Sequence, residues 1–179
     1  MEGQKRRLYE HISQPGYLEG LNGKSLEELR ALREECREVE NEISFERRLC
    51  HARIDILSAE LDRRLGKSSG ELIERLPEIL GHDERGAGGL LPPRAPDFSI
   101  PRNADIPRRR VEEIVGERTL AQLNGVQTEE IKGIITNLAE HERNLSGRRH
   151  RVHEVMDSIQ AEIVRRYTSG EADPSAALN

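Results

Sequence analysis

Two long stretches of the chain carry apolar residues at alternating steps of three and four, separated by polar positions. The first stretch, residues 25–66, opens with Ser25 and Glu28, which form a capping-box pattern, and closes at Gly66, a residue suited to a helix C-cap. The second, residues 128–167, opens with Thr128 followed by two glutamates. Such spacing over several heptads is typical of a coiled coil. The pattern therefore predicts two helices, the first roughly 60 Å long.

The apolar positions of each predicted helix form one seam along the helix. The seam of the first helix comprises Leu29, Leu32, Cys36, Val39, Ile43, Glu46, Cys50, Leu57 and Leu61, and that of the second Ile131, Ile134, Leu138, His141, Leu145, Arg148, Val152, Val155, Ile159 and Ile163. Polar residues interrupt it at Glu46, His141 and Arg148, and near Arg53. Because globular helices average about 11–12 residues, helices of this length need a long partner. Antiparallel pairing within one chain is the simplest arrangement, although the connection of some sixty residues also permits parallel pairing or pairing between two chains.

The remaining segments lack this periodicity. Residues 1–24 contain Pro15 and Gly16 and are predicted to be a flexible arm. Residues 67–127 read as a linker with short helices near 71–80, 107–115 and 118–126, and 81–107 is its Gly/Pro-rich part. Residues 168–179 are predicted to be a disordered tail. The predicted fold class is all-α: a long antiparallel two-helix coiled coil with short connecting helices and a Gly/Pro-rich linker.

Composition supports this interpretation and narrows the function. The chain is 34% charged and only 3% aromatic, with a formal net charge of −5, a balance typical of solvated helices and unsuited to coating nucleic acid. We therefore expect no DNA contact, even from the basic run 108–110. No apolar run approaches the roughly 20 residues that span a membrane. Cys36 and Cys50 would lie roughly 21 Å apart on one helix, too far for a disulfide. We expect a cytoplasmic protein that does not contact membranes.

A polar pattern, E-x3-S-x2-R-x3-H-x3-D, occurs once in each predicted helix. Its ten residues are Glu40, Ser44, Arg47, His51 and Asp55 in the first copy, and Glu142, Ser146, Arg149, His153 and Asp157 in the second. At 100° per residue, each copy forms a stripe about 80° wide and about 22 Å long. Both copies stand in the same register to their seams, so antiparallel helices would line one patch with local two-fold symmetry. A solvated coiled-coil flank explains one copy but not two matching ones.

The residue types in this stripe suit a guanine nucleotide. Arginine matches the O6/N7 edge of guanine or grips a phosphate. A carboxylate accepts from the N1–H and N2–H₂ donors of guanine, and Ser and His donate to phosphate oxygens. A doubled set of these groups suits a ligand with two-fold symmetry, and cyclic di-GMP has two guanines and two phosphates.

The doubled motif resembles that of RsiG, the cyclic-di-GMP-dependent anti-sigma factor family of actinomycetes, over the two long helices. The family commonly has Gln at the fourth motif position, where this chain has His51 and His153. The resemblance implies an antiparallel coiled coil that binds cyclic di-GMP as a dimer through the ten motif residues. The loaded protein would then hold the sporulation-type sigma factor WhiG away from RNA polymerase.

The sequence offers three other interpretations, and it disfavours two of them: we expect no metal site and no enzymatic activity. His150 and His153, with nearby aspartates, have the helical spacing of metal ligands, but Arg149 lies among them. A ligand-independent coiled-coil adaptor would use the same charges to select a partner helix. An enzyme is disfavoured because the sequence has no Gly-rich phosphate loop, nucleophile elbow or catalytic cysteine setting.

Apolar residues of the linker could also help to hold a partner: Leu90, Leu91, Phe98 and Ile100.

Overall fold

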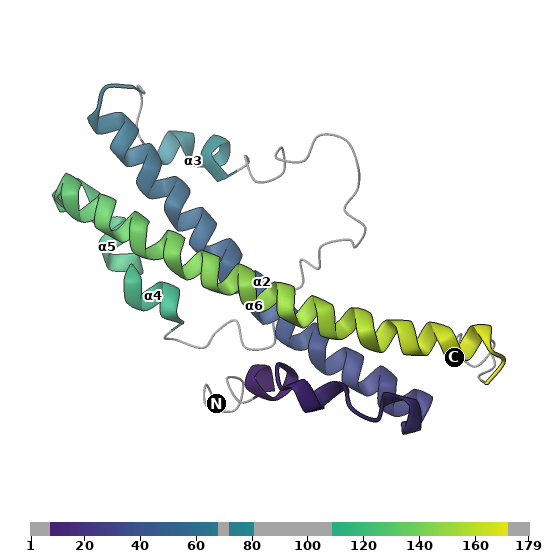
Figure 1. Ribbon diagram of the computed structural model, residues 1–179. Helices are drawn as coiled ribbons and strands as arrows, with labels where there is room; N and C mark the ends of the chain where they lie inside the picture. Colours follow the sequence, from purple (N-terminus) through teal and green to yellow (C-terminus); the bar gives the residue numbers. More distant parts are fainter. Residues whose placement is uncertain (1–7, 68–71, 81–108, 172–179) are drawn as a thin grey trace. The chain divides into compact units, whose positions relative to one another are not determined.

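The structure is a computed structural model that describes residues 8–67, 72–80 and 109–171. Every regular element in these ranges is a helix (Figure 1), which confirms the predicted all-α class. After a helical turn at residues 8–12, the elements are η1 (Pro15–Leu18), η2 (Leu21–Gly23), α2 (Leu26–Arg64), α3 (Leu72–Leu80), α4 (Arg110–Ile114), α5 (Glu117–Ala121), η4 (Leu123–Gly125) and α6 (Thr128–Thr168). The predicted linker 81–107 lies outside the described ranges, and with it the candidate partner-binding residues Leu90, Leu91, Phe98 and Ile100. Residues 172–179 of the predicted tail lie outside them as well.

The ends of α2 form as the sequence predicts. The Ser25 backbone N–H donates to the Glu28 carboxylate at 2.6 Å, and the Glu28 N–H donates to Ser25 Oγ at 3.2 Å, which completes the capping box. At the other end Gly66 takes the left-handed conformation with φ 67°. The N–H of Lys67 then reaches the Asp62 carbonyl at 2.9 Å, and that of Gly66 reaches Arg63 at 3.1 Å. These two bonds define a Schellman cap, for which glycine is the favoured residue.

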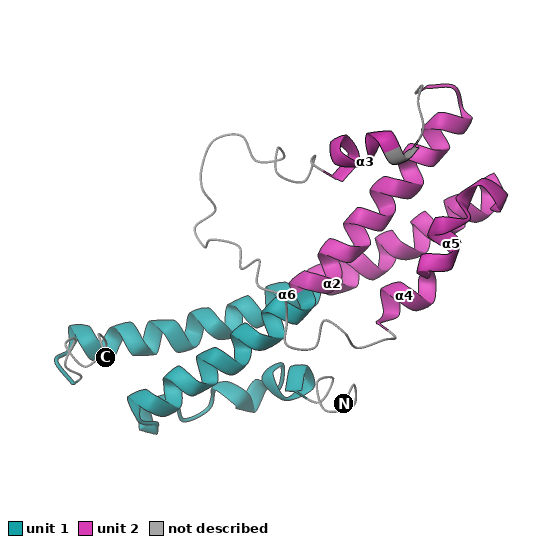
Figure 2. Cartoon of the chain, turned by 180° about the vertical axis from the view of Figure 1, so that it is seen from behind, with its two compact units in different colours: residues 1–43, 147–179 teal, residues 44–146 magenta. Residues whose placement is uncertain are grey.

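The chain divides into two compact units, residues 1–43 with 147–179 and residues 44–146 (Figure 2). In unit 1, Arg33 bonds Gln160 at 2.7 Å and Arg30 bonds Tyr167 at 2.6 Å. The end of α6 therefore lies beside the start of α2. In unit 2, His141 lies 2.9 Å from Glu46, and Arg64 bonds Thr128 at 3.2 Å. Both units therefore contain antiparallel segments of α2 and α6, and the predicted antiparallel pairing within one chain is confirmed.

The predicted seam supplies most of the buried apolar residues. Those with at most 8% exposure are Leu29, Cys36, Val39, Ile43, Cys50 and Leu57 from α2, and Ile131, Leu138, Leu145, Val152, Val155, Ile159 and Ile163 from α6. The two cysteines are free, and burial raises the pKa of the Cys50 thiol to about 12. Both therefore behave as small apolar side chains at neutral pH.

The segments that flank the long helices cover polar positions of the seam. In unit 1 the Arg148 guanidinium lies over the Tyr9 ring, 4.9 Å from its centroid. In unit 2 Arg53 is only 8% exposed and donates to the Val115 carbonyl at 2.8 Å, just after α4. A buried guanidinium needs such a partner. These contacts explain how a long two-helix seam accommodates arginine.

The described part of the N-terminal segment differs from the flexible arm expected for residues 1–24. Residues 8–24 fold into short helical turns, and Ile12 and Tyr17 are buried at 0% and 8% exposure. Arg166 also donates to the carbonyls of Leu21 and Asn22 at 2.9 and 3.2 Å. Buried apolar area and satisfied carbonyls order this segment despite its glycines and proline. Farther along the chain, Pro77 lies inside α3, which matches the short helix expected near 71–80.

Near the C-terminal end of each long helix, a glutamate accepts hydrogen bonds from two arginines, and we call each such set an arginine clamp. In unit 2, Glu60 is 1% exposed and accepts from Arg63 and Arg64, and Arg64 also donates to the Leu123 and Val126 carbonyls at 2.6 and 2.7 Å. In unit 1, Glu162 accepts from Arg165 and Arg166. The tripeptide Leu-Asn-Gly recurs at 21–23 and 123–125, with the same spacing of 102 residues that separates Glu60 from Glu162. The internal repeat thus extends well beyond the five-residue motif.

The seam yields a test of stability. We expect Leu57→Ala to lower the free energy of unfolding by about 2–5 kcal/mol, because Leu57 is fully buried and its truncation leaves a cavity. Leu65→Ala, at a 62% exposed position near the end of the same helix, should change it by less than about 0.5 kcal/mol. Urea unfolding followed by circular dichroism measures both. Equal changes in the free energy of unfolding for the two substitutions would contradict the burial of Leu57 in the seam.

Candidate functional site

The ten motif residues lie on α2 and α6, five on each helix. Unit 1 contains Glu40 from the first copy with Arg149, His153 and Asp157 from the second, and unit 2 contains Ser44, Arg47, His51 and Asp55 from the first copy with Glu142 and Ser146 from the second. The boundary between the units falls within both copies, so each unit combines residues from both.

In unit 2 three side chains converge on one carboxylate, and we call this set the Glu142 cluster. Arg47 Nη1 and His51 Nε2, both from α2, each lie 3.3 Å from Glu142 Oε1. Ser146, one turn along α6, donates its hydroxyl to the same oxygen at 2.8 Å. The Glu142 side chain is 17% exposed, whereas those of Arg47 and His51 are 32% and 34% exposed. The carboxylate is thus largely covered while the cation and the imidazole reach solvent.

Unit 1 contains the corresponding set, the Glu40 cluster. Arg149 donates its Nε–H to Glu40 Oε1 at 2.8 Å, and His153 Nε2 lies 3.3 Å from that oxygen. Glu40 is 14% exposed, and the arginine and histidine are 34% and 24% exposed. The two clusters therefore share one design: a shielded glutamate from one motif copy faces the half-exposed arginine and histidine of the other copy.

Sequence reasoning did not foresee this cross-pairing. It predicted that the acids and arginines would share a face, but not that each glutamate would bond the opposite copy. The signal was present, because antiparallel helices with equivalent registers bring the start of one copy to the middle of the other. The other motif residues lie on the same helices: Ser44 is buried at 8% exposure, Asp55 is half-buried and Asp157 is exposed.

The Glu142 cluster stabilises a charged carboxylate. Burial raises the pKa of Glu142, but hydrogen bonds from Ser146 and Arg47, with the charges of His51 and Arg47, outweigh it and hold the pKa below its ordinary value. The carboxylate is therefore ionised at neutral pH. Arg47 Nε is shielded from solvent and has no hydrogen-bond partner among the described residues. This cluster thus keeps a charged acceptor and an unused donor side by side.

A second carboxylate in unit 2, Glu46, lies on the seam next to Arg47. Its Oε1 is 2.9 Å from His141 Nε2 and 3.4 Å from the Val111 backbone nitrogen. The side chains of Glu46 and His141 are 16% and 14% exposed. Burial raises the pKa of Glu46. This effect is outweighed by the hydrogen bond and charge of His141, the hydrogen bond from the Val111 N–H and the charge of Arg109, so that the pKa lies below its ordinary value. Because this pair is enclosed between α2, α6 and α4, we assign it a structural role.

His150 and His153, the histidines with the helical spacing of metal ligands, contact different residues. His153 faces Glu40, whereas His150 is 78% exposed and lies 3.7 Å from Glu154 on its own helix. Among residues 8–67, 72–80 and 109–171, no group of three or more His, Cys, Asp or Glu side chains is arranged to hold a metal ion. The two histidines therefore take part in different contacts.

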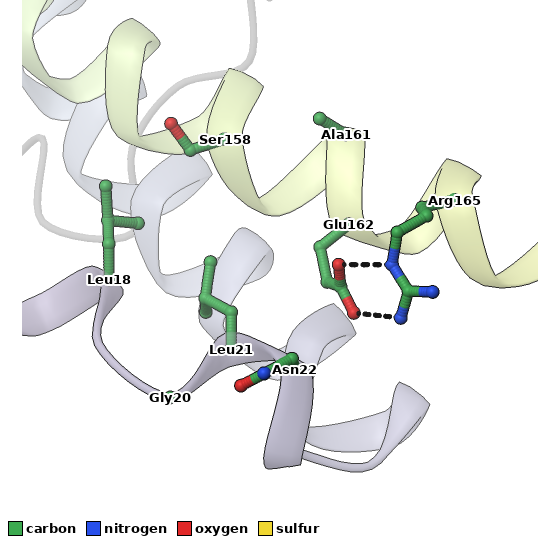
Figure 3. Close-up of a pocket in the computed structure, with 8 residues that line it drawn as sticks. All are labelled: Leu18, Gly20, Leu21, Asn22, Ser158, Ala161, Glu162 and Arg165. Atoms are coloured by element: carbon green, nitrogen blue, oxygen red, sulfur yellow. Dashed lines mark hydrogen bonds and ion pairs between the residues drawn. The ribbon is translucent and has the colours of Figure 1, made fainter.

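A shallow groove of about 430 Å³ lies in unit 1, between the N-terminal turns and α6 (Figure 3). Leu18 and Leu21 line one side, and Ser158, Ala161 and the ion-paired Glu162 and Arg165 line the other. None of the ten motif residues lines it. The groove is thus separate from the Glu40 cluster in composition, and it contains few polar groups that are not already paired.

The fold is an all-α antiparallel helix pair with one polar cluster in each unit. The chain belongs to the RsiG-like family, whose sequence model matches residues 15–80 and 117–178. These segments include both long helices and all ten motif residues. The family suggests an anti-sigma factor role, with a sigma factor as the partner. A search of curated proteins gave no match. No helix in the described ranges is long and apolar enough to cross a membrane.

The half-buried Glu46–His141 pair predicts a pH-dependent contribution to stability. We expect Glu46→Gln to lower the free energy of unfolding at neutral pH by roughly 1–3 kcal/mol, because charge-assisted bonds become weaker neutral ones. The folded-state pKa of Glu46 is lowered, so the stabilisation is present above its ordinary value of 4.5 and is lost as pH falls through the lowered pKa.

Urea unfolding at neutral pH and at about pH 3.5 measures the difference between Glu46→Gln and the wild type. The difference should shrink at the lower pH. Glu34→Gln is a matched control on α2, since Glu34 is 60% exposed and lies 3.4 Å from Arg37. It should change the free energy by less than about 0.5 kcal/mol at either pH. A difference for Glu46→Gln that grows on acidification would contradict the assigned role.

Proposed function

We propose that this protein is a non-catalytic anti-sigma factor that binds cyclic di-GMP through the Glu40 and Glu142 clusters. In this proposal the loaded protein sequesters a sporulation-type, WhiG-like sigma factor from RNA polymerase in the cytoplasm. The observation that carries it is the repeated cluster: each unit presents a charged carboxylate with a half-exposed arginine and histidine from the other motif copy. Membership of the RsiG-like family supports the choice of partner.

The chemistry of each cluster supports a guanine nucleotide. An ionised carboxylate accepts from the N1–H and N2–H₂ donors of guanine. The guanidinium presents several donors, so it can retain its glutamate while another edge meets guanine O6/N7 or a phosphate oxygen. Because Arg47 and Arg149 are 32% and 34% exposed, a ligand can reach them from solvent. Ser146 and the two histidines add donors for phosphate.

Arg47 supplies a further reason to expect an additional acceptor. Its Nε–H is buried and without a partner among the described residues, which costs about 1–3 kcal/mol of desolvation when unpaired. Its Nη1–Glu142 distance of 3.3 Å is also longer than the usual charge-assisted bond. An incoming phosphate or guanine acceptor would let the guanidinium reorient and use more of its donors.

The proposed link between ligand and partner is electrostatic. Each cluster joins α2 to α6 through charge, so a bound nucleotide adds negative charge and bridging contacts between the same two helices. The resulting surface would differ in charge and rigidity from that without ligand. Since coupling between two binding sites is reciprocal, ligand and sigma factor should strengthen each other's binding by the same factor.

A ligand-independent adaptor is the second candidate. It is favoured by the fact that both glutamates already have protein partners, so the clusters can hold the helices together unaided. Under this alternative the charges would specify helix pairing, and nucleotide would have no effect on melting temperature.

The arginines test ligand binding directly. We expect the wild type to bind cyclic di-GMP in isothermal titration calorimetry. Arg47→Ala combined with Arg149→Ala should weaken binding by at least about 100-fold, because each substitution removes charged hydrogen bonds worth roughly 1.5–3 kcal/mol. Arg151→Ala is the matched control, since Arg151 is 42% exposed and pairs with Glu154 on its own helix.

Two results would count against ligand binding. Absence of heat with the wild type would leave the adaptor interpretation ahead. Unchanged affinity in the double arginine variant would place the nucleotide elsewhere on the protein. Circular dichroism of each variant establishes that the helices remain folded.

The partner is tested by titrating a WhiG-like sigma factor with and without cyclic di-GMP. We expect about 5- to 150-fold tighter association with ligand present, the usual range of coupling free energies. The same factor should appear when ligand is titrated with and without sigma factor. Equal affinities in both arms would reject the proposed coupling while leaving nucleotide binding intact.

A further inference from the structure

A histidine occupies the same place in both clusters, beside the shared carboxylate oxygen. His51 Nε2 lies 3.3 Å from Glu142 Oε1, and His153 Nε2 lies 3.3 Å from Glu40 Oε1. Both side chains are only partly covered, at 34% and 24% exposure. Imidazole is the side chain whose charge changes near neutral pH. Each cluster therefore contains one imidazole next to its central carboxylate.

Among the described residues, charged groups from both helices lie close to each histidine. His51 faces Glu142 from α6 and Arg47 on its own helix, whose Nη1 is 3.4 Å from the ring, and Asp55 follows one turn later. His153 faces Glu40 from α2, with Arg149 and Asp157 one turn to either side on α6. With neutral imidazole, the central glutamate and arginine of each cluster balance in charge.

We infer that nucleotide binding at these clusters is linked to proton uptake by His51 and His153, so that the ligand binds more tightly as pH falls through the neutral range. The inference rests on the proposed function, since it concerns the same clusters and an anionic nucleotide. It assigns the two histidines a role in regulating affinity in addition to donating a hydrogen bond.

The sign follows from the charge that the ligand adds. A phosphodiester brings one negative charge into a cluster whose glutamate and arginine already balance. Negative charge near an imidazole favours its protonated form. The bound state therefore holds more protons than the free state, and by linkage the affinity rises as pH falls. An added preference equivalent to one pH unit at each histidine corresponds to about tenfold in affinity per histidine.

Calorimetry on the full chain tests the inference with cyclic di-GMP at about pH 6 and about pH 8, the two sides of imidazole titration. Each titration is repeated in two buffers of different ionisation enthalpy, so that the heats report the number of protons taken up. We expect affinity at least about tenfold tighter at the lower pH, with net proton uptake near neutrality.

Substitution by glutamine separates charge from hydrogen bonding, because the amide donates but does not titrate. His51→Gln combined with His153→Gln should retain binding and lose both the pH dependence and the proton uptake. Each single variant should lose about half of the uptake. His150→Gln is the matched control, since His150 is 78% exposed and faces Glu154 outside the clusters. It should behave as the wild type.

The outcomes distinguish this inference from the proposed function. Tight binding with equal affinity at both pH values, and without proton uptake, would overturn the inference while nucleotide binding stands. A pH dependence that persists in the double glutamine variant would assign the protons to other groups and also overturn it. Absence of binding at every pH would reject the proposed function, and this inference with it.

Discussion

A glutamate held between an arginine and a histidine of the opposite motif copy is the interaction on which the two clusters depend. It occurs at Glu40 in unit 1 and at Glu142 in unit 2, and in both the carboxylate is more covered than its partners. A partly buried carboxylate without a cation would be costly, and so would the cation alone. Each motif copy is therefore incomplete in electrostatic terms. The antiparallel arrangement completes it, because that direction brings the acid of one copy to the arginine of the other.

The same repeat fixes the ends of the helix pair. Glu60 and Glu162 each accept from two arginines that follow on the next turn, and Arg64 and Arg166 reach backbone carbonyls at or beside a Leu-Asn-Gly turn. Such carbonyls precede a long helix and would otherwise need water or other donors. Anchoring both ends in this way limits sliding of α2 along α6. A slide of one turn would displace each glutamate by about 5.4 Å from its arginine, so the clamps and clusters reinforce one register.

Periodicity and capping residues were sufficient to predict the two helices, their seam and the Ser25–Glu28 cap, because these depend on local spacing. They were insufficient for features that depend on tertiary contacts. The N-terminal segment has the composition of an arm, yet Ile12 and Tyr17 are buried. Polar seam residues such as Arg53 were recognised as unusual, but the Val115 carbonyl that satisfies Arg53 lies 62 residues away. The motif stripes were found from the sequence, whereas the cross-pairing of glutamates needed the helix direction as well.

The two halves of the internal repeat differ at several seam positions. Glu46 corresponds to Arg148 in the repeat, and His141 corresponds to Val39. Unit 2 therefore has a half-buried acid–imidazole pair, and the Val111 N–H donates a further hydrogen bond to the acid. In unit 1 the Arg148 guanidinium lies over the Tyr9 ring instead. These differences face the covering segments, which share the Leu-Asn-Gly turn but have different residues at the contact, Tyr9 in unit 1 and Val111 in unit 2. The motif positions one residue further along each helix keep the same residue types. The two halves thus differ where each meets its own covering segment, and they agree at the motif positions, where the proposed nucleotide would meet the same groups in both clusters.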